Sequence, residues 1–113
     1  MTRVEPPDTP DFIIEWFEQL IEVERTQRAI GAYAVASLSK ADVFVILVEE
    51  LKQRKDDLPA LVIELKAGAA LNKKYKEEVV YPSQAYMVYL GYEWAYDEVA
   101  GIVESWLRDT GKL

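Results

Sequence analysis

The sequence predicts a small α/β fold in which a mixed β-sheet of about four strands is flanked by helices. Two observations support this prediction. Two short apolar runs rich in β-branched residues, Val43–Val48 and Ala60–Glu64, are typical of buried strands. Apolar residues also repeat at helical spacing near both ends of the chain, after Pro10 and after Asp97. The expected order of elements is therefore helix, strands, helix, strand, helix.

The composition fits one domain, residues 10–113, that follows a loose arm at residues 1–9. Half of the 113 residues are apolar, which is enough for a single hydrophobic core. The chain has no run of 18 apolar residues and no leader typical of secretion. We therefore expect an intracellular, cytoplasmic protein that makes no membrane contact.

Cysteine and histidine are both absent. Their absence excludes disulfides, thiolate metal sites and a Ser-His-Asp triad. Any catalysis would depend on carboxylate, lysine, tyrosine or hydroxyl groups. A metal ion held by oxygen ligands alone would be a hard ion, Mg²⁺ or Mn²⁺.

The net charge is −7, but the basic residues are unevenly distributed. Seven of the thirteen lie between Lys52 and Lys76, where they outnumber three acids and give a local charge of +4. This stretch is either a rim that contacts DNA phosphates or a set of solvated lysines, whereas the acidic remainder would suit a protein partner. The candidates for nucleic-acid binding are Lys52, Arg54, Lys55, Lys73, Lys74 and Lys76.

A first helix begins with Thr9 as N-cap, Pro10 at the first helical position and Asp11 in the first turn. Its apolar face comprises Ile13, Trp16, Phe17, Leu20 and Ile21. The same face continues into Glu24, Gln27 and Arg28. Either the helix emerges from the core there, or its last turns line a polar cleft.

Two strands are expected next, Ala29–Leu38 and Val43–Val48, and residues 49–59 would join the second strand to the Ala60–Glu64 strand as a long hairpin. The alternative for the second strand is a helix from Ala41 to about Lys55, begun by a capping box at Ser39 and Asp42. We favour the strand because six consecutive apolar residues lack the polar face of an amphipathic helix.

The C-terminal part begins with an irregular crossover over residues 67–80. A short helix, Ser83–Leu90, is expected to end at Gly91. Tyr92–Tyr96 alternates as a half-buried strand does, and Asp97 caps a last helix that ends near Asp109.

A candidate active site follows from the strand prediction. Glu64 and Lys66 are two residues apart, so a strand would direct both side chains to one face. Asp42 stands at the end of the neighbouring strand. A metal ion lowers the pKa of bound water and neutralises phosphate charge, which phosphodiester cleavage requires. The alternative is that Glu64 and Lys66 simply pair at a sheet surface.

From Ser39 onward the chain resembles the VRR-NUC (virus-type replication-repair nuclease) domain of the PD-(D/E)xK superfamily, which is akin to archaeal Holliday-junction resolvases. The resemblance lies in SKADVFVIL, LPALVIELKAG and YPSQAYMVYLGYEWAYDEVAGIVESWL. The matched catalytic positions are Asp42, Glu64, Lys66 and Gln84. In the predicted site, Asp42, Glu64 and the Leu65 carbonyl would bind the metal ion, with Lys66 beside the metal-bound water. Glu24 is the candidate for the accessory acid that such enzymes often place on the first helix.

This resemblance implies a restriction-endonuclease-like core and a Mg²⁺- or Mn²⁺-dependent endonuclease that acts on branched or structured DNA, as in DNA repair. It further implies a homodimer from a viral or prokaryotic source. One alternative is a catalytically inactive nuclease-like domain that serves as a protein-interaction or regulatory module. Another is a helical interaction protein in which Val43–Leu51 is helix. The many tyrosines and tryptophans of the C-terminal part would suit core packing or an interface better than base stacking.

Overall fold

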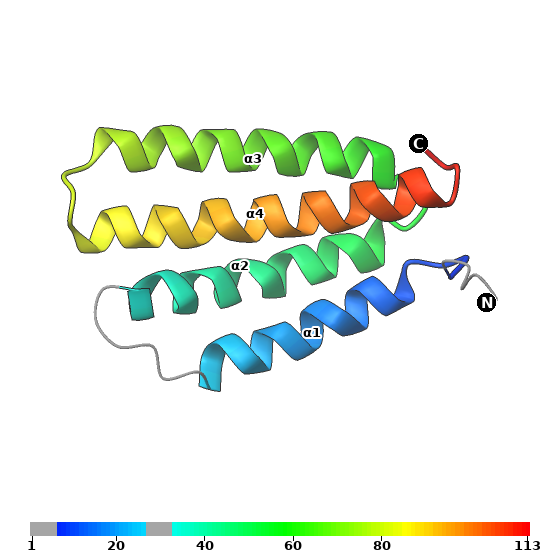
Figure 1. Ribbon diagram of the computed structural model, residues 1–113, viewed down its shortest axis with the longest axis horizontal. Coiled ribbons are helices and arrows are strands. Elements are labelled where there is room, and N and C mark those ends of the chain that lie inside the picture. The colour runs from blue at the N-terminus through cyan, green and yellow to red at the C-terminus, as the bar shows by residue number, and fades with distance from the viewer. Residues whose placement is uncertain (1–6, 27–32) are drawn as a thin grey trace, which may run out of the picture.

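The computed structural model describes residues 7–26 and 33–113, and these residues form a bundle of four helices. The helices are α1 (Asp11–Thr26), α2 (Tyr33–Gln53), α3 (Leu58–Glu78) and α4 (Gln84–Asp109), and successive helices run in opposite directions (Figure 1). No strand occurs among the described residues. The predicted α/β fold with a mixed sheet, and the restriction-endonuclease-like core with it, is therefore wrong.

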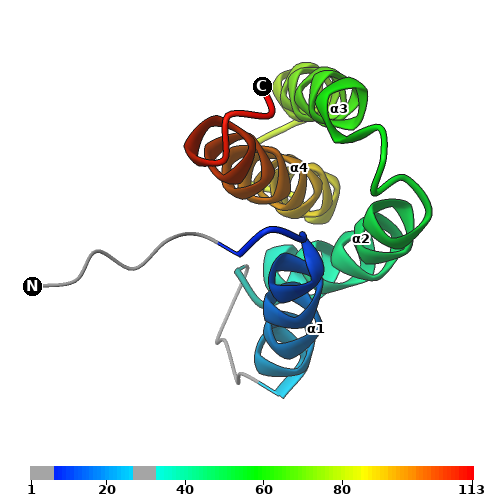
Figure 2. The ribbon, with the colours of Figure 1, turned by 90° about the vertical axis from the view of Figure 1, so that its right-hand side faces the viewer.

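The four helices follow a zigzag rather than the corners of a square. The principal pairings are α3 with α4, α4 with α2, and α2 with α1. Figure 2, which looks nearly along the helices, shows α2 and α3 on the same side of α4 and separated from each other. The helix α4 is thus the centre of the fold, and α3 is held mainly by α4.

The run Val43–Val48 is part of α2, so the helical alternative is right over this run and the predicted strand is wrong. The predicted helix start at a capping box of Ser39 and Asp42 is also wrong, because α2 begins at Tyr33. Val43, Phe44, Leu47 and Val48 are all buried. A helix that packs against two neighbours needs a wide apolar face, so the run does not require a strand. Phe44 meets Phe17 of α1 with ring centroids 5.2 Å apart. The predicted strand Ala29–Leu38 is also wrong from residue 33 onward, and residues 27–32 lie outside the described part.

The predicted strand Ala60–Glu64 is wrong, because it lies within α3. Residues 67–78 of the predicted irregular crossover belong to the same helix. Pro59 lies in the first turn of α3, where a missing N–H is tolerated. The strand prediction depended on only five residues. Over a longer window the buried side chains recur at helical spacing; they are Leu58, Leu61, Val62, Leu65 and Ala69.

The helix α4 begins where the sequence predicted. The N-cap Ser83 accepts a hydrogen bond through Oγ from the backbone N–H of Tyr86 at 3.1 Å. The predicted helix end at Gly91, the strand Tyr92–Tyr96 and the cap at Asp97 are wrong, because all lie inside one helix of 26 residues. The apolar face after Asp97 is confirmed; its buried members are Val99, Val103, Trp106 and Leu107.

The first helix is confirmed in its core but begins one residue later than predicted, and the Thr9 hydroxyl donates to the Asp11 carboxylate instead of capping a backbone N–H. α1 begins at Asp11 and buries Ile13, Phe17 and Ile21, but Trp16 is 53% exposed. Of the predicted loose arm, residues 7–9 are described, and the carbonyl oxygen of Pro7 accepts a hydrogen bond from the Trp106 indole at 2.8 Å.

Candidate functional site

The structure separates Glu64 and Lys66, whose shared strand face was the basis of the predicted active site. Both residues lie on α3, and side chains two residues apart on a helix point about 200° apart. Glu64 pairs with Arg54, whereas Lys66 pairs with Glu104 of α4. The two side chains therefore serve different helix contacts.

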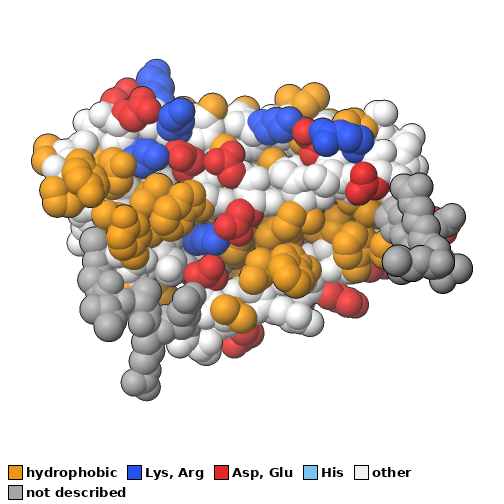
Figure 3. All heavy atoms as spheres, viewed as in Figure 1, with side chains coloured by type: hydrophobic (Ala, Val, Ile, Leu, Met, Phe, Trp, Pro, Cys, Tyr) orange, Lys and Arg blue, Asp and Glu red, His pale blue; other side chains and the backbone are white. Residues whose placement is uncertain are grey.

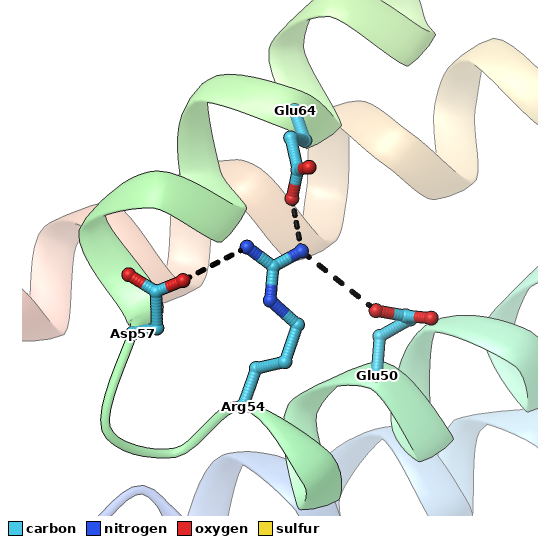
Figure 4. Close-up of polar contacts among 4 residues, drawn as sticks. All are labelled: Glu50, Arg54, Asp57 and Glu64. Carbon is cyan, nitrogen blue, oxygen red and sulfur yellow. Dashed lines mark hydrogen bonds and ion pairs between the residues drawn. The ribbon is translucent and has the colours of Figure 1, made fainter.

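Glu64 belongs to an ionic cluster at the turn between α2 and α3. Figure 4 shows the Arg54 guanidinium between three carboxylates, those of Glu50, Asp57 and Glu64. Arg54 Nη2 lies 3.1 Å from Asp57 Oδ2, and Nη1 lies 3.9 Å from Glu50 Oε2. Hydrogen bonds to Glu64 and then to Asp57 raise the pKa of Arg54 above its ordinary value. Arg54 thus links the end of α2 to α3.

The other predicted metal ligands are dispersed. Asp42 is exposed on α2, and Leu65 packs in the core of the bundle. Glu24 binds Lys40 at 3.3 Å, and the same Lys40 Nζ lies 2.6 Å from Glu98 of α4. Gln84 is exposed in the first turn of α4. The described residues contain no group of three or more carboxylates arranged to hold a metal ion.

Most of the predicted DNA-binding cations are paired with acids. Lys52 lies 3.5 Å from Glu49, Lys55 lies 2.7 Å from Asp11, and Lys76 lies 3.1 Å from Glu93. The Lys55 contact also lowers the pKa of Asp11. Lys73 and Lys74 are exposed near the end of α3. The local charge of +4 read from the sequence is thus largely compensated in space.

A groove lies between α2 and α3. Its volume at the α2–α3 turn is about 280 Å³. Leu47, Leu61 and Leu65 are buried at its base, whereas Ile46 is 60% exposed at its edge. The full lining is Ile46, Leu47, Glu50, Arg54, Leu61, Glu64, Leu65, Gly68 and Tyr96.

Three half-buried tyrosines extend this groove along α4. Tyr89, Tyr92 and Tyr96 are spaced by three and four residues, so they occupy one face of the helix. Tyr89 and Tyr92 also line a hollow of about 450 Å³ with Gln84, Ala85 and Val88. The Tyr89 ring meets Tyr75 of α3 with centroids 5.4 Å apart. We call the whole feature, from Gln84 to the Arg54 cluster, the tyrosine groove.

Gly68 allows the floor of the groove to form. A Cβ atom on Gly68 would lie 2.8 Å from Cε1 of Tyr96. The Tyr96 ring can therefore rest against the α3 backbone. Leu71, 47% exposed, follows Gly68 on the same side of α3 at helical spacing.

Apolar side chains are also exposed on the opposite face, that of α1 and α4. Figure 3 shows them in two patches, one toward the α3–α4 turn and one over α1. Phe12 and Trp16 of α1, and Tyr33 and Tyr81 at the other end, are each at least 40% exposed.

A more polar cavity of about 490 Å³ lies at the end of the bundle where α1 and α3 begin. Lys55 crosses it to Asp11, and Lys112 lies 4.6 Å from the centroid of the Trp106 ring. Lys55, Asp11 and Lys112 are thus engaged with the chain itself.

No protein-family model, curated protein or solved structure matches this chain. The VRR-NUC resemblance therefore stays a prediction from sequence. None of the described helices is long and apolar enough to cross a membrane.

The sequence shows the many aromatic residues of the C-terminal part, but the strand prediction did not indicate the groove. Assigning Tyr92–Tyr96 to a strand placed Tyr92, Trp94 and Tyr96 on one face. In the helix, Trp94 instead turns to the other side and stacks on Tyr33 at 6.4 Å, while Tyr92 and Tyr96 stay together. Testing the spacing of Tyr89, Tyr92 and Tyr96 against a helical period would have found the groove floor.

Proposed function

We propose that this chain is a helical protein-interaction module that binds a helix of a partner protein in the tyrosine groove. The observation that supports this function most directly is the row of half-buried tyrosines on α4. Tyr89 and Tyr92 line a hollow on α4, and Tyr96 lines the groove between α2 and α3. Tyrosine offers a broad apolar ring with a hydroxyl at its edge, and such residues are enriched at protein interfaces. Contiguous exposed apolar surface on a soluble domain is typical of an interaction site.

The arrangement of the helices favours a helix as the ligand. α2 and α3 both pack on α4, and residues of both helices line the groove on either side of Tyr96. A helix laid between them would contact both and complete a four-helix bundle with α2, α3 and α4. Docking of an amphipathic helix in an apolar groove is a common mode of peptide recognition.

Fluorescence anisotropy of labelled peptides of about 14 residues, long enough for about four helical turns, tests this function. Each peptide carries leucine on one face and lysine, glutamine or glutamate on the other. We expect at least one peptide to bind, and Ile46→Gln together with Leu71→Gln to weaken it about tenfold, the effect of 1.4 kcal/mol.

The matched control is Ile63→Gln together with Val23→Gln. Ile63 is 71% exposed on α3, about 140° around the helix from Gly68, whereas Leu71 lies about 60° from it. Val23 is 53% exposed on α1, which does not line the groove. The control should leave binding within about twofold of wild type. Binding by none of the three peptides, or equal weakening in both double variants, would contradict the proposed function.

Endonuclease activity, suggested by the family resemblance, is the competing function. It is tested by cleavage of labelled single-stranded, duplex, flap and four-way-junction DNA with Mn²⁺ at low salt, where phosphate binding is strongest. Metal-dependent cutting that Lys66→Ala abolishes would overturn the interaction-module proposal. Lys66→Ala removes only the Lys66 contact to Glu104, so the variant should remain folded.

A further inference from the structure

Resting on the proposed function, we infer that the helix bound in the tyrosine groove is basic, with its cationic side chains at the α2–α3 end of the groove. Two features of the groove support this partner, an acidic cluster with excess negative charge and a floor of tyrosines. A third argument is that the same charge disfavours a second copy of this chain as the ligand. The arrangement of the helices favours a helical ligand, and the charged residues of the groove favour a basic one.

The acidic cluster provides the charge. Glu50, Asp57 and Glu64 carry three negative charges around the single positive charge of Arg54, which leaves a net charge of −2. Glu50, Arg54 and Glu64 line the groove itself, and Asp57 reaches it only through its contact with Arg54. Glu50 and Glu64 lie on opposite walls of the groove, and Glu64 is mainly exposed. A carboxylate that shares one guanidinium with two others retains lone pairs for a further donor, which an arginine or lysine of the ligand can supply.

The floor of the groove also suits a cation. Tyr96 lines the groove beside Glu50 and Glu64. An ammonium or guanidinium group over the face of a tyrosine is attracted by the ring quadrupole. The chain already makes such a contact on the neighbouring face of α4, where Lys76 Nζ lies 5.8 Å from the centroid of the Tyr86 ring. A long basic side chain can lay its methylenes on the tyrosines and place its charge at the carboxylates.

The length of the groove matches a short helix. Ala85 and Tyr96 mark its extent along α4, and eleven residues of helix span about 17 Å. That distance corresponds to about three turns of a bound helix. The ligand therefore needs one apolar face of three turns and one or two basic residues at the end nearest Arg54.

A second copy of this chain is a poorer ligand. Two grooves related by a two-fold axis would bring the acidic clusters of both copies into one interface, and like charges at an interface cost several kcal/mol. The net charge of −7 adds to this repulsion. The acidic groove thus selects for a basic partner and against itself.

The experiment compares the lysine, glutamine and glutamate peptides described above in fluorescence anisotropy, with the variant pair Glu50→Gln and Glu64→Gln. We expect the lysine peptide to bind at least about tenfold more tightly than the others, and this pair to weaken it by about five- to twentyfold, since both carboxylates would contact the ligand. The matched pair is Glu15→Gln and Glu22→Gln, on the exposed face of α1. It removes the same two charges and should leave binding within about twofold.

Each outcome has a distinct meaning. If the glutamine or glutamate peptide binds as tightly as the lysine peptide, and Ile46→Gln with Leu71→Gln still weakens this binding about tenfold, the basic partner is overturned while the helix-binding function stands. If both glutamate pairs weaken the lysine peptide equally, its binding is non-specific attraction to an acidic surface and the inference fails. If no peptide binds but sedimentation shows a dimer that Ile46→Gln dissociates, a second copy is the ligand, and the inference fails with it.

Discussion

Gly91 of α4 lies directly against the backbone of Ala36 in α2. A Cβ atom on Gly91 would be 2.2 Å from the Ala36 carbonyl oxygen. The backbones of Gly91 and Ala36 both belong to helices, so neither can shift without displacing its helix. We therefore expect Gly91→Ala to lower the free energy of unfolding by about 1–3 kcal/mol, as overpacking does, despite the higher helix propensity of alanine. Denaturant titration followed by circular dichroism measures this change.

Gly101 provides the matched control in the same helix. Nothing lies within 4 Å of a Cβ atom built on it, and the residue is exposed. Gly101→Ala should raise the free energy of unfolding by up to about 1 kcal/mol, because alanine has the better helix propensity. If both alanine variants are stabilised, the close approach of α2 and α4 at Gly91 is not present in solution.

Ser83 fixes the start of α4 through its hydrogen bond from the Tyr86 N–H at 3.1 Å. Ser83→Ala leaves that N–H without its side-chain partner and should cost about 1 kcal/mol of stability. Ser105→Ala, at an exposed interior position of the same helix, should cost nothing measurable. Thermal unfolding of the two variants compares them, and an equal midpoint shift would exclude a capping role for Ser83.

The sequence predicted the two ends of the chain because these helices expose one face to solvent. Ile13, Phe17 and Ile21 repeat at helical spacing, as do Val99 and Val103, and all five are buried as expected. The prediction for the middle of the chain was wrong for a different reason. α2 contacts both α1 and α4, so its apolar residues cover more of the helix surface than one amphipathic face allows.

The arrangement predicted for the active site was wrong because it depended on the predicted strands. Glu64 and Lys66 share a face only in a strand. In the helix they point to different sides, so Glu64 pairs with Arg54 and Lys66 pairs with Glu104. The groove could not be predicted, because it depends on how far apart α2 and α3 lie on α4. That spacing is set by packing, including the contact that Gly68 allows with Tyr96, and not by local sequence.

Lys40 joins three helices from a nearly buried position. Its Nζ lies 3.3 Å from Glu24 of α1 and 2.6 Å from Glu98 of α4, and the side chain is 13% exposed. Lys40→Met leaves two carboxylates near each other without their cation, so we expect a loss of about 2–3 kcal/mol in the free energy of unfolding.

Lys52→Met is the comparison for Lys40→Met. Lys52 lies 3.9 Å from Glu18 and 3.5 Å from Glu49, with 42% of its side chain exposed. Exposed pairs contribute little, so this variant should lose less than about 1 kcal/mol. Equal losses in the two methionine variants would show that the Lys40 contacts are no stronger than surface pairs.

Glu104 makes stability depend on pH at acid values. The hydrogen bond from Lys66 is the main cause that lowers the pKa of Glu104 below its ordinary value of 4.5, with smaller effects of charge from Lys66 and Arg108 against the opposing effect of burial. A carboxyl whose pKa is lower in the folded protein stabilises the fold above its unfolded pKa, and this stabilisation is lost as pH falls through the folded value. Lys66→Met should therefore reduce stability at pH 7 and have a smaller effect at pH 3. That pH lies below the ordinary pKa of 4.5, so protonation of the unfolded carboxyl has already removed part of the stabilisation there. Denaturant titrations of the two proteins at both pH values give the four free energies required. A Lys66→Met effect of the same size at pH 7 and pH 3 would show that Lys66 stabilises the fold by packing its methylenes and not through the Glu104 carboxylate.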